Sequence, residues 1–172
     1  RSKSYDAFLI GGGRIGFEFM DQFKEDNVSF LVIDHDPEII GRMALEKTPH
    51  LFGDARDPDL LEDLKIHGAQ VVVSTIPDLE TNLVVLSVSK RADNGPAVIL
   101  AAHSISNALE LYDAGADYVI LPHFLGGSYA ASLVRRFTHE ATDLQSIRSR
   151  HIKRLQERSQ LGHEHPQIER LR

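Results

Sequence analysis

Three glycines near the start of this 172-residue chain have a spacing suited to binding phosphate groups. Gly11, Gly13 and Gly16 form G-x-G-x-x-G, directly after an apolar run and at the opening of a segment with helical periodicity. The first glycine permits a tight turn, the second lets a pyrophosphate approach the backbone, and the third lets helix and strand pack closely. The N–H groups at the start of the following helix would then face the anion.

The residues around this turn favour one class of ligand. Arg14 and Ile15 lie inside the turn, and Arg14 either contacts phosphate through its guanidinium or is an exposed residue at the helix start. Asp34 follows the last motif glycine by eighteen residues and ends an apolar run, where a carboxylate accepts hydrogen bonds from ribose hydroxyls. Because Asp34, His35 and Asp36 stand there without an arginine, NAD or an adenine mononucleotide is favoured over NADP.

Polar residues also end three other predicted strands. Asp54 either binds a ligand or forms an Asx turn, and Ser74 and Thr75 either line the same crevice or serve as turn residues ahead of Pro77. His103 either faces the crevice or satisfies a local hydrogen bond. Since ligands of parallel α/β sheets bind at the carboxyl ends of the strands, all four are candidate site residues.

The elements that position these residues alternate between strand and helix. Apolar runs predict strands near 6–10, 28–33, 50–52, 71–74, 97–102 and 118–120, and periodic segments predict helices at 14–25, 37–46, 58–66, 79–91, 105–114 and 124–139. Asp36 and Asp57 each precede a proline, which is typical of a capped helix start. The pattern predicts an α/β, Rossmann-like, doubly wound parallel six-stranded sheet followed by C-terminal helices.

Composition and charge narrow the possible functions. The chain is 42% hydrophobic and 26% charged, it lacks cysteine, and it contains no apolar run of the roughly 18 residues that a membrane span needs. Residues 1–131 carry a net charge of −10 and residues 132–172 a net charge of +4, which add up to the −6 of the whole chain. An acidic body argues against a nucleic-acid partner.

Five motifs in order resemble the RCK, or TrkA-N, nucleotide-binding domain of potassium channels and transporters. They are GGGRIG, IDHDPE, FGDARDPDLLEDLKIHGAQVVVSTIPD, TNL and LYDAGADYVILP, and together they lie within residues 6–122. The phrases VVSTIPDLETNL, AAHS and LPHFLGGSYAASLV are most similar to the cytoplasmic domains of Kef-type cation/proton antiporters. We therefore expect a nucleotide-binding domain at 1–122, and a crossover helix with a basic helical tail at 123–172.

The resemblance implies a regulatory domain on the cytoplasmic side of the cell membrane. NAD(H) or AMP, ADP or ATP would be its ligand and would control an attached membrane-embedded potassium or cation/proton transport domain. The family pattern implies a homodimer that exchanges a helix, here 124–139, whose apolar and small residues suit close packing. Carried over to this chain, the ligand contacts are Gly11, Gly13, Arg14, Gly16, Asp34, Asp54 and Ala55.

Two other functions compete with this interpretation. A short-chain dehydrogenase would need Tyr-x-x-x-Lys, and none of the four tyrosines has a lysine at that spacing, so no catalytic residue is predicted. Asp54, Asp78 and Glu80 could instead hold a divalent cation. We favour the simpler interpretation that Asp78 caps a helix and Glu80 is a first-turn acid, and we predict no metal site.

Overall fold

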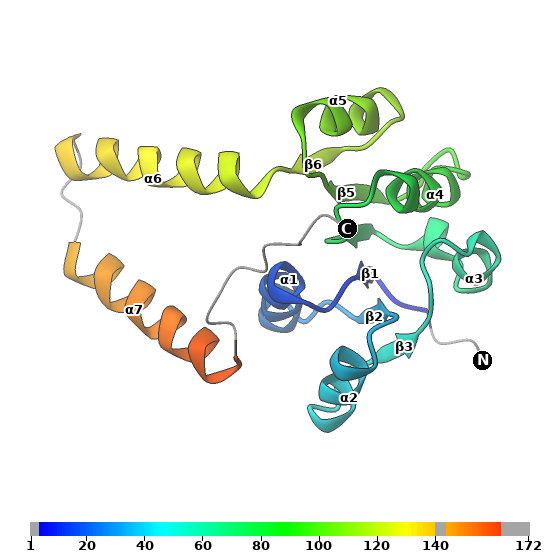
Figure 1. Cartoon of the computed structure of the whole chain (residues 1–172), viewed down its shortest axis with the longest axis horizontal. Helices are drawn as coiled ribbons and strands as arrows, with labels where there is room; N and C mark the ends of the chain where they lie inside the picture. Colours follow the sequence, from blue (N-terminus) through cyan, green and yellow to red (C-terminus); the bar gives the residue numbers. More distant parts are fainter. Residues whose placement is uncertain (1–3, 140–143, 163–172) are drawn as a thin grey trace. The chain divides into compact units, whose positions relative to one another are not determined.

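A computed structural model of the protein describes residues 4–139 and 144–162 (Figure 1). Its centre is a six-stranded sheet in the order β3-β2-β1-β4-β5-β6, and every neighbouring pair is parallel. The strands are β1 (Ala7–Ile10), β2 (Phe30–Asp34), β3 (His50–Phe52), β4 (Val71–Ser74), β5 (Ala97–Ala101) and β6 (Tyr118–Ile120). The predicted Rossmann-like, doubly wound α/β fold is confirmed.

Helices connect the strands and cover both faces of the sheet. They are α1 (Arg14–Glu25), α2 (Pro37–Leu45), α3 (Pro58–Asp63), the short 3₁₀ helix η1 (Ile66–Gly68), α4 (Leu79–Ser89) and α5 (Ile105–Asp113). One apolar core contains side chains of α1 and α2, and the other contains side chains of α3, α4 and α5. Successive strand residues alternate between the two cores, as Leu9 and Ile10 do.

Side-chain caps explain where most of these helices begin. Asp36 and Asp57 cap α2 and α3 as predicted, each just before a proline at the first helical position. Asp78 caps α4, which confirms the simpler of its two interpretations, and Ser104 caps α5. Caps of this kind depend only on neighbouring residues, so they can be recognised in the sequence.

Several predicted boundaries differ from the structure by one to three residues, and two of these differences lie near the glycine turn or in α3. The helix expected at 58–66 ends at Asp63, because Lys65 adopts a left-handed conformation with φ 56° and a 3₁₀ turn follows. The strand expected at 28–33 instead runs from Phe30 to Asp34. The second difference makes Asp34 the last residue of β2, where it pairs with Phe52 of β3.

The chain divides into two compact units, Arg1–Leu121 and Pro122–Arg172. In the second unit, α6 spans Pro122–His139 and begins two residues earlier than predicted, with proline at its first position, and α7 spans Leu144–Gln160. Neither helix has a fully buried residue. Parts of the predicted basic tail, 140–143 and 163–172, lie outside the described residues.

No helix in the described part of the chain combines the length and apolar character needed to cross a membrane.

Candidate nucleotide-binding site

The glycine turn lies at the point where the sheet changes its winding direction. Strands β1 and β4 are neighbours, but β1 continues to β2 on one side and β4 continues to β5 on the other. Ligands of open α/β sheets bind outside the carboxyl ends of the strands at such a switch point. Thr75, directly after β4, donates from its hydroxyl to the carbonyl groups of Ile10 and Gly11 at 3.2 and 3.1 Å, so both strand ends are tied together there.

The three motif glycines meet different surroundings. Gly11 has φ +91°, and a Cβ atom there would lie 2.4 Å from the Thr75 hydroxyl oxygen. A Cβ atom on Gly16 would lie 2.2 Å from the Gly11 carbonyl oxygen, so both positions require glycine for the fold itself. A Cβ atom on Gly13 would have no neighbour within 4 Å. Gly13 therefore leaves space beside the backbone that the fold does not use.

Helix α1 begins without a side-chain cap. Gly13 is its N-cap and has no side chain to accept a hydrogen bond, whereas α2, α3, α4 and α5 are all capped by Asp or Ser. The first N–H groups of a helix have no intrahelical partner and carry the positive end of the helix dipole. Arg14 and Ile15, both half-buried, form the first turn. This helix start suits an anionic ligand.

Asp34 lies beside the turn and is already hydrogen-bonded. One carboxylate oxygen accepts from the Gly12 N–H at 2.9 Å, and the other accepts from the Asp36 N–H at 2.9 Å. The residue is only 6% exposed. Each carboxylate oxygen has a second lone pair, so Asp34 can still accept from ribose hydroxyls.

Arg42 on α2 also contacts the turn, and we did not identify it in the sequence. Its guanidinium Nη2 donates to the Gly12 carbonyl oxygen at 2.9 Å. Gly12 itself packs closely against α2 and β2, because a Cβ atom there would lie 2.8 Å from Ile39 and 3.2 Å from Val32. The thirty-residue separation between Arg42 and Gly12 leaves no local sequence signal for this contact.

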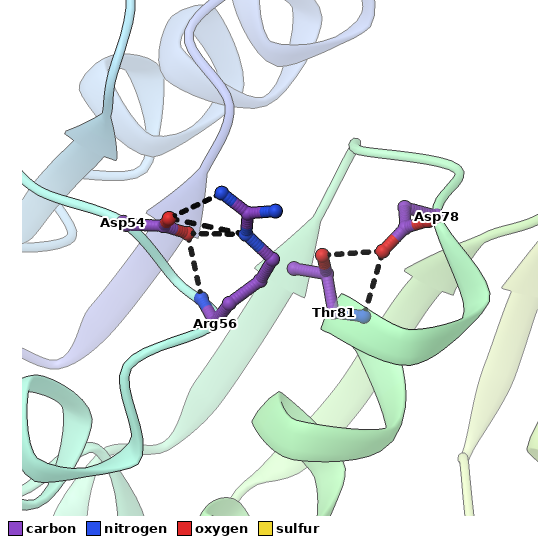
Figure 2. A network of polar contacts seen from close by, with 4 residues as sticks. All are labelled: Asp54, Arg56, Asp78 and Thr81. Carbon is purple, nitrogen blue, oxygen red and sulfur yellow. Dashed lines mark hydrogen bonds and ion pairs between the residues drawn. The ribbon is translucent and has the colours of Figure 1, made fainter.

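Asp54 makes an ion pair with Arg56 (Figure 2). The Asp54 carboxylate accepts from the Arg56 backbone N–H at 2.9 Å, from Nε at 3.0 and 3.1 Å, and from Nη2 at 2.7 Å. These hydrogen bonds, led by those from the Arg56 side chain, lower the pKa of Asp54 to about 2. The hydrogen bond from the Arg56 backbone N–H to the Asp54 side chain is an Asx turn, so this interpretation of Asp54 is confirmed. The sequence DAR, with an acid and a base two residues apart, was a signal for the ion pair.

Other charged side chains lie near the ion pair of Asp54 and Arg56, on loops that follow other strands. The pKa of Asp78 is lowered first by the Thr81 hydroxyl and N–H groups, which donate at 2.6 and 2.8 Å, and also by the charges of Arg56 and His103 (Figure 2). The charge of His35 lowers the pKa of Asp54 in the same way, after the contributions of Arg56. The exposed side chains of His35 and His103 therefore lie within electrostatic range of this edge.

Two other candidates are buried. Ala55 is 4% exposed and forms part of the core, so only its backbone can serve a ligand. Ser74 has no exposed surface, which gives its side chain no access to a ligand, and we leave it out of the proposed site. Within the described ranges, no three His, Cys, Asp or Glu side chains are grouped as a metal site.

Asn82 is a second residue that the site analysis of the sequence did not single out. It is fully buried on α4, and its amide nitrogen donates to the carbonyl oxygens of Ile76 and Ala101, both at 2.8 Å. These bonds tie the loop after β4 to the end of β5. A polar residue inside the apolar helix sequence LETNLVVL was the available signal, since buried amides are retained where they are hydrogen-bonded.

Known proteins share this sequence pattern. Potassium channel protein 1 of Methanocaldococcus jannaschii is 30% identical over 128 residues, which cover 73% of this chain and 38% of that protein. The glutathione-regulated potassium-efflux system protein KefC of Escherichia coli is 28% identical over 111 residues, which cover 64% of this chain and 18% of that protein. The chain thus spans less than two fifths of the length of these relatives.

Solved structures share the fold. The GsuK channel protein bound to ADP has a TM-score of 0.58 and 26% identity, covering 81% of this chain and 36% of that one. The Kef C-terminal domain of Shewanella denitrificans in its AMP-bound form has a TM-score of 0.60 and 18% identity, covering 91% and 93%. The TrkA-N domain model matches residues 7–122, more than half of the chain. The chain belongs to the TrkA-N domain family.

Proposed function

We propose that this chain binds an adenine nucleotide and regulates potassium or cation/proton transport through a membrane-embedded domain attached to it or associated with it. The ligand is AMP, ADP, ATP or NAD(H), and its phosphates lie on the turn formed by Gly11, Gly13 and Gly16. Its ribose lies at Asp34, and its base lies toward Asp54 and Ala55. Arg14, Ile15, Thr75, His35 and His103 complete the surroundings of the site.

One observation carries this proposal. At the switch point of the sheet, an uncapped helix start and an open position beside Gly13 lie next to the buried carboxylate of Asp34. The backbone N–H groups supply donors for phosphate, and Asp34 supplies acceptors for the ribose. No catalytic group is needed for this role, and we propose that the chain is not an enzyme.

The relatives support the ligand class and the context. A relative at 26% identity was solved with ADP, and two others are named as a potassium channel and a potassium-efflux protein. We therefore place the domain on the cytoplasmic side of the membrane. Divalent-cation sensing has less support, because Arg56 already occupies the Asp54 carboxylate with an ion pair.

The assembly that we propose is a homodimer through α6. This helix exposes large apolar side chains that the described part of the chain does not cover: Phe124, Leu125, Tyr129, Val134 and Phe137. Several large exposed apolar side chains on one helix support an interaction surface there. A dimer would let a nucleotide-dependent change in one domain act on the transport domain through its partner.

Isothermal titration calorimetry and thermal shift with AMP, ADP, NAD and NADP test the proposed ligand. AMP, ADP or NAD should raise the melting temperature, since a ligand at a hundredfold its Kd adds about 2.7 kcal/mol to the free energy of unfolding. NADP should bind more weakly, because the Asp34 carboxylate repels a 2′-phosphate. The absence of binding by all four ligands would overturn the proposed function, and equal binding of NADP would overturn the role of Asp34.

A further inference from the structure

The turn that would hold the phosphates consists of residues with unusual conformational freedom. Gly11, Gly12 and Gly13 are consecutive, and glycine restricts the backbone less than any other residue. A peptide group between two glycines can rotate so that its carbonyl oxygen, rather than an N–H, faces a ligand. A site that binds phosphate through N–H groups therefore needs contacts that fix each peptide plane.

Side chains fix the peptide group between Gly11 and Gly12 at both ends. The Gly11 carbonyl oxygen accepts from the Thr75 hydroxyl at 3.1 Å, and the Gly12 N–H donates to Asp34 at 2.9 Å. These two contacts come from the strand ends on opposite sides of β1. The orientation of the first peptide group is thus determined by residues already assigned to the site.

The next peptide group, between Gly12 and Gly13, is held by Arg42. Its Nη2 donates to the Gly12 carbonyl oxygen at 2.9 Å. The carbonyl and the N–H of a trans peptide point in opposite directions, so this contact directs the Gly13 N–H away from Arg42. Gly13 is the N-cap of α1 and the position with open space beside it.

We propose that Arg42 is a positioning residue for phosphate binding, an inference that rests on the proposed nucleotide function. Arg42 holds the Gly12 carbonyl on the α2 side and thereby keeps the Gly13 N–H available to an anion. Arg42 is half-buried, and its neighbours on α2, Ile39 and Met43, pack against the apolar core on that face of the sheet. Arg42 thus acts on the ligand through the backbone.

Calorimetric titration of the full chain with AMP and with adenosine tests this role. Arg42→Met removes the donor and keeps much of the side-chain length, and it should weaken AMP binding by about tenfold, the typical effect of losing one charge-assisted hydrogen bond. Adenosine has no phosphate, so its affinity should change less than about twofold. Arg42→Lys retains a long cationic donor and should restore most of the AMP affinity.

Arg91→Met is the matched control, because Arg91 pairs with Glu62 away from the glycine turn. It should bind both ligands as the wild type does. Hydrogen exchange supplies a second measurement without ligand: in Arg42→Met, the Gly12 amide, which donates to Asp34, should exchange faster while the strand amides do not change.

Several results would overturn the inference. AMP affinity equal to the wild type in Arg42→Met would do so, as would equal losses for AMP and adenosine, which would indicate general destabilisation. A loss that disappears at about 0.5 M salt would mean that Arg42 acts only through its charge. If Arg42→Met fails to fold, Arg42→Gln carries the test, since it also removes the guanidinium donor to the Gly12 carbonyl oxygen while keeping a polar side chain, and it should show the same split between AMP and adenosine. Failure of the wild type to bind AMP would instead overturn the proposed function.

Discussion

At the scale of single residues, Gly13 separates the demands of the ligand from those of the fold. A Cβ atom at Gly13 has no neighbour within 4 Å, so Gly13→Ala adds a methyl group without a clash inside the protein. We expect the melting temperature to stay close to that of the wild type while AMP binding is lost, because the methyl group occupies the space of the phosphate. Thermal melting and calorimetry measure the two effects.

Gly16→Ala is the contrasting variant. Its Cβ atom would lie 2.2 Å from the backbone oxygen of Gly11, which cannot move as a side chain can. We expect the free energy of unfolding to fall by about 1–3 kcal/mol. If Gly13→Ala unfolds the protein as Gly16→Ala does, Gly13 serves packing and the phosphate site is not there.

Asp78 gives a prediction about pH. Hydrogen bonds from Thr81 lower the pKa of Asp78 in the folded state, so its contribution to stability is present above the unfolded pKa of about 4 and is lost as the pH falls through the folded pKa. Asp78→Ala should lower the free energy of unfolding by about 1 kcal/mol at neutral pH. Chemical denaturation at several pH values measures the difference.

Asp78→Asn is the control, since asparagine caps a helix as well as aspartate but does not titrate. The difference between wild type and Asp78→Asn should shrink as the pH falls from about 5 through the lowered folded-state pKa of Asp78. A difference that stays constant over this range would show that the charge of Asp78 does not act through Thr81.

At the scale of elements, Asn82 joins the ends of two strands through one helix. Its amide nitrogen donates to the carbonyl oxygens of Ile76 and Ala101, and Asn82→Ala removes this donor from both. We expect a loss of about 2–4 kcal/mol in the free energy of unfolding, measured by chemical denaturation. Asn94→Ala, in an exposed loop, should change it by less than about 0.5 kcal/mol. Equal effects of the two variants would contradict the role of Asn82.

Elements with local signals could be predicted from the sequence. The helix starts after Asp36 and Asp57 depend on a capping side chain and the next proline, and both were found where expected. The doubly wound parallel sheet was predicted from the alternation of strand and helix, whereas the order of its strands comes from the structure. The glycine turn and Asp34 were recognised by spacing, and the structure brings them within hydrogen-bond distance.

Contacts between distant residues could not be predicted in the same way. Arg42 and Gly12 are thirty residues apart, and nothing beside Arg42 in the sequence indicates that it faces the turn. The buried position of Ser74 depends on which face of β4 its side chain occupies, and in a strand buried on both faces the sequence does not show this. Left-handed Lys65, which ends α3 early, is likewise a lysine where glycine or asparagine would be the usual signal.

At the scale of the whole molecule, the proposed homodimer is the feature that would connect the proposed nucleotide binding to the proposed role in transport. Within α6, Leu125 and Tyr129 are one helical turn apart and are 49% and 61% exposed. A pair of apolar side chains four residues apart on one face is suited to packing against a second helix. We therefore expect the wild-type chain to form a dimer through this face.

Light scattering coupled to size-exclusion chromatography tests this expectation on the full chain. The double variant Leu125→Glu, Tyr129→Glu should be a monomer, because the substitutions place charges in an interface that excludes water. Leu45→Glu is the matched control: Leu45 is 87% exposed on α2, outside α6, and its variant should remain a dimer. A monomeric wild type would contradict the dimer itself. A dimer that survives the double variant would move the interface away from this face of α6 and would remove the exchanged helix as the route from nucleotide to transport domain.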